Sequence, residues 1–189
     1  AYGVNPIKDI QILCPMNRGS AGARTLNEVL QLALNPPTEA SVLKFGTKFS
    51  VGDKVMQIEN NYDRDVFNGD IGFVTRLDAE EEELTVDFDG REVVYPYGEL
   101  DELVLCYATT IHKSQGSEYP IVVLPITMQH YVMLKRNLIY TGVTRGKMLV
   151  ILVGQKKALA MAVRGKQTIA RNTGLRHWLR NENPTQNEF

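Results

Sequence analysis

The spacing of hydrophobic residues divides the chain into three stretches, and the first predicts a strand, a loop and a helix. A short apolar run, Ile10-Gln-Ile-Leu-Cys14, predicts a buried strand, and the glycines of residues 19–22 predict a turn after it. Apolar residues then recur at helical spacing over residues 26–34. Asn35-Pro36-Pro37 ends that pattern, because proline cannot continue a helix.

Between residues 45 and 102 the pattern changes to short alternating segments separated by turn signals. The candidate strands are residues 54–59, 71–78, 84–88 and 91–95. Asp89-Gly90 lies between two of them and is a strong hairpin signal. Short strands at this density predict a small antiparallel β-barrel over residues 45–102, inserted into the rest of the chain.

Three nearly continuous apolar runs follow, over residues 103–108, 121–126 and 148–153. Such runs predict strands of a parallel sheet that is covered on both faces, here by helices that include residues 135–144 and 156–164. We therefore predict an α/β domain that is discontinuous over residues 1–44 and 103–180, followed by a disordered tail over residues 181–189. Tyr140 and Trp178 lie in apolar helical patterns and are expected to be core or helix-packing residues rather than platforms for base stacking.

The net charge of −1 conceals a strong asymmetry between the insertion and the last stretch. Residues 45–102 contain five basic and sixteen acidic residues, a net charge of −11, whereas residues 103–189 contain twelve basic and three acidic residues, a net charge of +9. Any contact with a polyanion is therefore expected in the last stretch. The basic residues of the insertion can add local contacts only if they cluster on one face; they are Lys48, Lys54, Arg64, Arg76 and Arg91.

Several functional classes find no support in the sequence. The apolar runs are far shorter than the roughly 18 residues of a membrane span, and the first residues lack the features of an export signal, so we expect a cytoplasmic protein without a membrane partner. Cys14 and Cys106 lie in apolar runs without a second ligand at zinc spacing, which predicts buried thiols and no metal site. The sequence also contains no Gly-x-x-x-x-Gly-Lys-Ser/Thr phosphate loop and no Gly-x-Ser-x-Gly motif.

Polar residues gather at two junctions between strands and helices, where open α/β sheets bind ligands. The first is the segment from Tyr107 to Tyr119, in which a buried strand runs into a mostly polar stretch with a glycine turn. The second is an apolar helix that ends in Thr144-Arg145. An arginine at such a position can offer a planar, bidentate fork to a phosphate.

These two segments carry a resemblance to superfamily-1 helicases. Thr110-Ile-His-Lys-Ser-Gln-Gly-Ser-Glu118 resembles their motif V, and Tyr140-Thr-Gly-Val-Thr-Arg145 resembles motif VI. The stretches Leu13–Gly19 and Leu26–Gln31 are similar to the motif IV region of the RecD-like branch, and the segments around Phe49–Met56 and Phe67–Asp70 are similar to its inserted barrel, domain 2B. The resemblance spans residues 8–180 and implies a RecA-like domain 2A interrupted by that barrel.

The resemblance assigns roles to eight residues. Arg145 and Arg18 would be catalytic arginines at the phosphates of the nucleotide, where they stabilise developing charge. Gly116 and Glu118 would approach the nucleotide, with the glutamate accepting from the ribose. The residues that would face single-stranded DNA are Thr110, His112, Lys113 and Ser114.

The resemblance also implies that the chain is one part of an ATP-dependent DNA helicase that moves 5′ to 3′. The full-length protein would use ATP with Mg²⁺, whereas this part would bind no cofactor tightly and would be inactive alone, because both Walker motifs are absent. The expected partners are single-stranded DNA, helicase domain 1 upstream, and other recombination or repair subunits. The alternatives are an exodeoxyribonuclease V α chain or RNA helicase of the same superfamily, and a non-catalytic module that presents the barrel to a partner.

Overall fold

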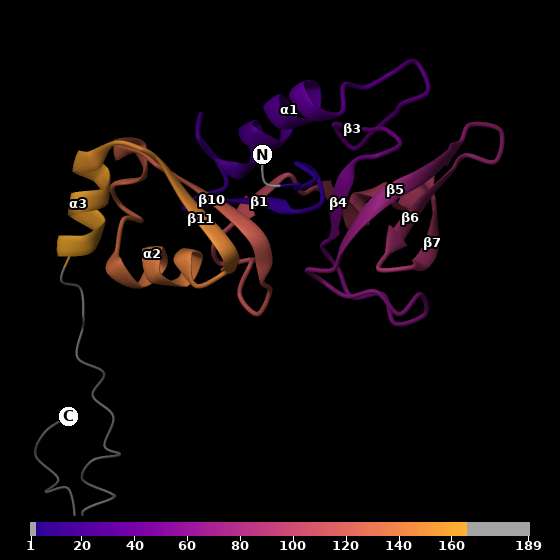
Figure 1. Cartoon of the computed structure of the whole chain (residues 1–189). Helices are drawn as coiled ribbons and strands as arrows, with labels where there is room; N and C mark the ends of the chain where they lie inside the picture. The colour runs from indigo at the N-terminus through magenta and orange to yellow at the C-terminus, as the bar shows by residue number, and fades with distance from the viewer. Residues whose placement is uncertain (1–2, 166–189) are drawn as a thin grey trace, which may run out of the picture.

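The computed structural model describes residues 3–165, which fold into a parallel sheet with helices on both faces and an antiparallel sheet beside it (Figure 1). The parallel sheet has the order β11-β10-β1-β9. Its strands are β1 (Ile10–Cys14), β9 (Ala108–Thr110), β10 (Tyr119–Ile126) and β11 (Gly146–Gly154). This sheet with its helices confirms the predicted α/β class.

Helices cover both faces of the parallel sheet because neighbouring residues of each strand point to opposite sides. Helix α1 (Ala23–Leu34) packs on the face that includes Cys14, whereas α2 (Arg136–Val143) and α3 (Lys156–Arg164) pack on the face of Leu13 and Leu124 (Figure 1). Most of β11 is nevertheless exposed within the described residues, with Met148 73% accessible. The predicted helices thus cover both faces of the sheet but leave most of this edge strand exposed.

The apolar run of residues 103–108 divides between the two sheets. Strand β8 (Leu103–Leu105) pairs antiparallel with β4 (Lys54–Gln57), and only β9 joins the parallel sheet, beside β1. The prediction of one strand over residues 103–108 was wrong, because an apolar run indicates burial and does not specify the partner strand. The run thus leads the chain from the insertion back into the parallel sheet.

The insertion is a five-stranded antiparallel sheet with its own core. Its order is β7-β6-β5-β4-β8, with β5 (Ile71–Asp78), β6 (Glu83–Phe88) and β7 (Arg91–Pro96), and the 3₁₀ helix η1 (Tyr97–Glu102) leads into β8. In β6 every second residue is buried, and these residues form the core together with Val93 and Tyr95 of β7. Asp89 and Gly90 both have positive φ, as the tight turn between β6 and β7 requires.

A short hairpin that the hydrophobic pattern did not predict precedes β4. Strands β2 (Val42–Lys44) and β3 (Thr47–Phe49) are joined by Phe45 and Gly46. The predicted boundary at residue 45 falls in the middle of this hairpin. A second 3₁₀ helix, η2 (Met128–His130), follows β10.

A buried carboxylate joins the two parts of the chain. Asp53 accepts hydrogen bonds from four donors: Gln31 Nε2 at 2.6 Å, Asn35 Nδ2 at 2.7 Å, Tyr107 Oη at 2.7 Å and Ser50 N at 2.7 Å. Burial raises the pKa of Asp53, and these hydrogen bonds oppose that rise. Because two of the donors lie on α1 or at its end, the carboxylate holds α1 against the start of the insertion.

Two smaller predictions concern the cysteines and the membrane. Cys14 and Cys106 are free and buried, as expected, and burial raises the pKa of the Cys14 thiol to about 12. Within residues 3–165 no helix is both long enough and apolar enough to cross a bilayer. The predicted tail, Trp178 and residues 166–180 lie outside the described residues.

Candidate functional site

Arg145 lies where α2 ends and β11 begins, at the amino edge of the parallel sheet. Its Nη1 donates to the main-chain oxygen of Ser117 at 3.1 Å, and its Nε donates to that of Thr141 at 3.3 Å. Nη2 lies 3.3 Å from Thr144 Oγ1. The side chain is half-buried, so the guanidinium is fixed by its own helix and by a separate loop while part of it remains accessible.

The loop that receives Arg145 ends at the start of β10, beside β11. Tyr119 N donates to the main-chain oxygen of Arg145 at 2.8 Å, and Lys147 Nζ lies 3.3 Å from the Glu118 carboxylate. Gly116 has a φ of +91°, a conformation that other residues rarely adopt, and its exposed backbone turns the loop towards this edge. We call Gly116, Glu118, Arg145 and Lys147 the amino-edge cluster.

The close packing of α2 on β10 sets the position of the cluster. Leu138, Ile139 and Gly142 face the core at helical spacing. A Cβ at Gly142 would lie 2.8 Å from Leu124 Cδ2, so a larger residue there would force the Leu124 side chain to move, whereas glycine lets the helix pack this closely as it stands. Tyr140, which we expected to be a core or helix-packing residue, is on the outer face of α2 and is 70% exposed, so that prediction was wrong.

The other predicted residues lie at the carboxyl edge of the sheet. Ile10 pairs with Ile121 and Cys14 with Thr110, so the end of β1 is about six strand residues from the level of Tyr119, on the order of 20 Å. Arg18 is exposed in the loop that follows β1, in which Ser20 Oγ lies 2.7 Å from Gln129 Oε1, beyond the carboxyl end of β10. The structure therefore does not bring Arg18 to Arg145, and the assignment of Arg18 to the nucleotide rests on resemblance alone.

The four residues expected to face DNA differ in their surroundings. Ser114 is fully buried, and its hydroxyl donates to the main-chain oxygen of Ile111 at 2.8 Å. Its position fits a role in shaping the loop and does not fit a contact with a strand. Thr110 is partly buried, and its Oγ1 accepts from Lys113 N at 3.3 Å, whereas His112 and Lys113 are exposed.

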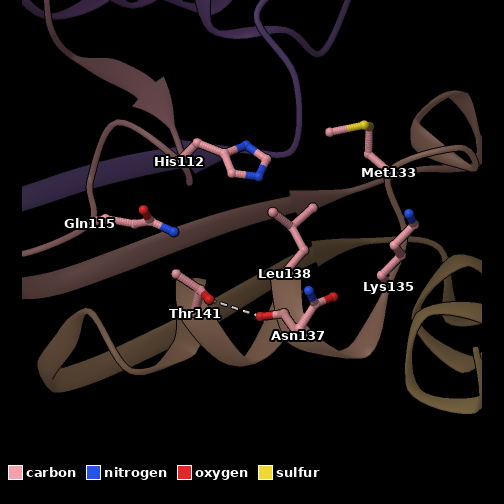
Figure 2. Close-up of a pocket in the computed structure, with 7 residues that line it drawn as sticks. All are labelled: His112, Gln115, Met133, Lys135, Asn137, Leu138 and Thr141. Atoms are coloured by element: carbon pink, nitrogen blue, oxygen red, sulfur yellow. Dashed lines mark hydrogen bonds between the residues drawn. The ribbon is translucent and has the colours of Figure 1, made fainter. Parts of the chain in front are cut away.

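His112 and Lys113 line two different depressions. His112 and Gln115 face α2 across a pocket of about 200 Å³, which Leu138 and Thr141 line from the helix (Figure 2). Lys113 instead lines a groove of about 700 Å³ between α1 and the β2–β3 hairpin. We call the second depression the α1–hairpin groove.

The α1–hairpin groove brings together basic residues from three separate segments of the chain. Arg24 lines it from α1, Lys48 from β3 and Lys113 from the loop after β9, while Glu28 is its acidic residue. The hairpin adds two exposed apolar side chains, Leu43 and Phe45. Strands of three residues give too short an alternation to detect, so the hairpin and its groove were missed.

The amino-edge cluster has the donors for a phosphate but lacks the ligands for a metal. Arg145 keeps N–H groups beyond the three contacts above, and Lys147 is 59% exposed. Residues 3–165 contain no group of three or more His, Cys, Asp or Glu side chains that could hold a metal ion. The cluster therefore offers hydrogen-bond donors to an anion at this edge of the sheet.

Two family models match successive parts of the chain. Residues 26–88 match the family described as the ATP-dependent RecD-like DNA helicase SH3 domain, and residues 105–153 match the UvrD-like helicase C-terminal domain. The chain is 41% identical over 166 residues to the ATP-dependent RecD2 DNA helicase of Deinococcus radiodurans, covering 88% of this chain and 23% of the relative. It is 30% identical to the RecBCD enzyme subunit RecD of Haemophilus influenzae, covering 88% and 24%. The chain thus spans about a quarter of the length of these relatives.

Solved structures with the same fold include Pif1 helicases. A structure of two coordinating Pif1 helicases at forked double-stranded DNA matches with a TM-score of 0.64 and 17% identity, over 95% of this chain and 46% of that one. The Bacteroides Pif1 helicase in complex with ADP-AlF3 and single-stranded DNA matches with a TM-score of 0.61 and 19% identity, over 96% and 46%. At this identity the likeness establishes the fold, a RecA-like domain with an inserted β domain.

Proposed function

We propose, on the premise that this chain belongs to the RecD-like branch of the superfamily-1 helicases, that it is the second motor domain of an ATP-dependent DNA helicase. The division into a discontinuous RecA-like domain and an inserted β domain is part of the proposal. In the longer protein this chain would face helicase domain 1 across the nucleotide.

The observation that carries the proposal is the fixed guanidinium of Arg145. The segment that resembles motif V and the segment that resembles motif VI meet at the amino edge of the sheet. Arg145 of the second segment donates a hydrogen bond to the main-chain oxygen of Ser117 in the first. An arginine held this way needs little reorganisation to meet charge that develops on a transferring phosphoryl group. Glu118 and Gly116 flank it and are proposed to approach the nucleotide.

The proposed cofactor is ATP with Mg²⁺, and this chain is expected to supply only part of its site. ATP would provide the phosphoanhydride bond whose hydrolysis drives movement. Arg145 would bind and orient its terminal phosphate, whereas the metal ligands would come from domain 1, since the described residues provide none. Arg18 remains a proposed second arginine on the strength of resemblance, at the opposite edge of the sheet.

Single-stranded DNA is the proposed track, and other recombination or repair subunits are proposed partners. Lys113 and Thr110 support a contact with a sugar-phosphate backbone, because both line the α1–hairpin groove. His112 is proposed to contact the strand from the separate pocket beside α2. Ser114 would act indirectly, by holding the shape of the loop.

A strand-displacement assay on the full-length protein tests the proposal. Forked substrates with a 5′ single-stranded tail, a 3′ tail or an RNA tail would be compared with and without ATP. We expect ATP-dependent displacement from the 5′ DNA tail. Failure to displace any strand would contradict the proposed activity. Preference for the RNA tail would make the protein an RNA helicase. Preference for the 3′ tail would reverse the proposed polarity.

A further inference from the structure

Phe45 occupies an unusual conformation at the tip of the β2–β3 hairpin. It has a φ of +49° and Gly46 has a φ of +76°, so both residues of the two-residue loop are left-handed. Asn, Asp and Gly are favoured at the first of these positions, and a bulky side chain there is strained by about 1 kcal/mol or more. The aromatic ring gains little from burial in return, since Phe45 is 62% exposed.

The exposed ring lies on the α1–hairpin groove, next to a cation with no partner in the described chain. Of the five basic residues of the insertion, Lys54 is buried, with Nζ donating to the main-chain oxygen of Ile10. The three arginines form ion pairs on the β domain: Arg64 with Glu99, Arg76 with Asp78, and Arg91 with Asp65. Of these five residues, Lys48 alone lines the groove, and it forms no ion pair within residues 3–165.

The groove continues from the hairpin to the loop that carries Lys113. Its walls are α1 on one side and the hairpin with β8 and β9 on the other. Arg24, Lys48 and Lys113 outnumber the single acidic residue Glu28, although the insertion as a whole is acidic. An aromatic ring among cations is the combination that binds single-stranded nucleic acid, because the ring stacks on a base and the cations neutralise phosphates.

We propose that the β2–β3 hairpin is a second contact for the single strand, in which Phe45 stacks on a base and Lys48 pairs with the backbone. The inference rests on the proposed function and extends it from the loop of Lys113 to a hairpin that the motif resemblance does not include. Because the buried carboxylate of Asp53 ties the insertion to α1, a strand in this groove would touch both parts of the chain as one unit.

The test is equilibrium binding of a fluorescent oligothymidylate to the full-length protein at several salt concentrations. Phe45→Asn is the informative variant, because asparagine suits the left-handed turn and should raise the melting temperature while removing the ring. We expect its affinity to fall between about five-fold and 150-fold with an unchanged salt slope. Lys48→Gln should instead reduce the slope of log affinity against log salt by about 0.7.

Two controls separate stacking from other effects. Tyr62→Asn removes another exposed aromatic ring of the insertion, one that does not line the groove, and should leave affinity unchanged. An abasic oligonucleotide should bind the parent and Phe45→Asn equally. If the parent does not bind the oligothymidylate, the proposed function fails and this inference with it. If the parent binds and Phe45→Asn binds equally well, the inference alone is overturned, and the hairpin is better explained as a protein-docking surface.

Discussion

Arg145 and Ser117 are joined by a hydrogen bond of 3.1 Å from Nη1 of the arginine to the main-chain oxygen of the serine. The bond links the end of α2 to the loop before β10, although 28 residues separate the two positions in the sequence. A main-chain acceptor cannot be changed by substituting Ser117, so the contact depends on the shape of the loop. Gly116, with its left-handed backbone, and Ser114, with its buried hydroxyl, are the residues that set this shape.

The isolated 189-residue chain is expected not to hydrolyse ATP. It lacks a phosphate loop in its sequence, and its described residues lack a metal site, so the terminal phosphate is neither positioned nor neutralised. A steady-state ATPase assay with single-stranded DNA measures this directly. ATP turnover that stays with the chain through successive purification steps would show that the phosphate loop and metal ligands of another domain are not needed for hydrolysis.

Loss of the Asp53 carboxylate should be among the most damaging single changes to stability. Asp53→Ala leaves Gln31, Asn35 and Tyr107 without their buried acceptor, and we expect a cost of roughly 3 kcal/mol or more in the free energy of unfolding. Asp65→Asn is the control, since asparagine tolerates the left-handed backbone of residue 65, the Asp65 side chain is 71% exposed and its ion pair with Arg91 contributes at most about 1 kcal/mol. Chemical denaturation measures the free energy of unfolding of both variants. Equal losses of this free energy would show that Asp53 does not hold α1 against the insertion.

His130 should make the fold sensitive to mild acid. Its side chain is 1% exposed, and burial lowers its pKa from the ordinary 6.5. The unfolded chain therefore takes up this proton first as pH falls, so stability is retained above pH 6.5 and declines below it until the folded pKa is reached. Unfolding measured between pH 7 and 5 should show a steeper decline for the parent than for His130→Gln. Parallel pH profiles of stability would mean that the pKa of His130 is the same in the folded and the unfolded chain.

Apart from Lys48 in the groove, the acidic insertion should add little to the long-range attraction of DNA. Arg76 and Arg91 already pair with carboxylates of the same domain, so Arg76→Gln and Arg91→Gln should leave the salt slope of oligonucleotide binding unchanged. Lys113→Gln, in the groove, should reduce the slope by about 0.7. A reduction of that size with the two arginine variants would place phosphates on the outer face of the insertion.

Predictions of structure from the hydrophobic pattern were most accurate where one local period determines an element. Strand β5 over Ile71–Asp78 and helix α3 over Lys156–Arg164 have the predicted bounds, because each is long enough to show its own spacing. Residues 103–108 divided between two sheets, and the β2–β3 hairpin was missed. Both depend on which strands pair, which a local pattern does not record.

The candidate site followed the motifs only in part. Arg145 contacts the residues on either side of Glu118, whereas Arg18 is at the opposite edge and Ser114 is buried in the loop, and the roles assigned to these residues stay predictions. Residue type indicates what a side chain can bind, whereas its direction depends on tertiary packing. Phe45 gave no signal in the sequence because its significance comes from a positive φ and from the groove beside it.

The central claim, that this chain supplies an arginine to a nucleotide held by another domain, is tested most directly by the ATPase rate of Arg145→Ala in the full-length protein. Arginines in this role contribute on the order of 10³-fold or more, so we expect turnover to fall by at least that factor while oligonucleotide affinity is kept. Arg145→Lys should recover little, since an ammonium lacks the fork, and Lys147→Ala, in the same cluster, should cost far less. ATP hydrolysis by Arg145→Ala within a few-fold of the parent would contradict the claim.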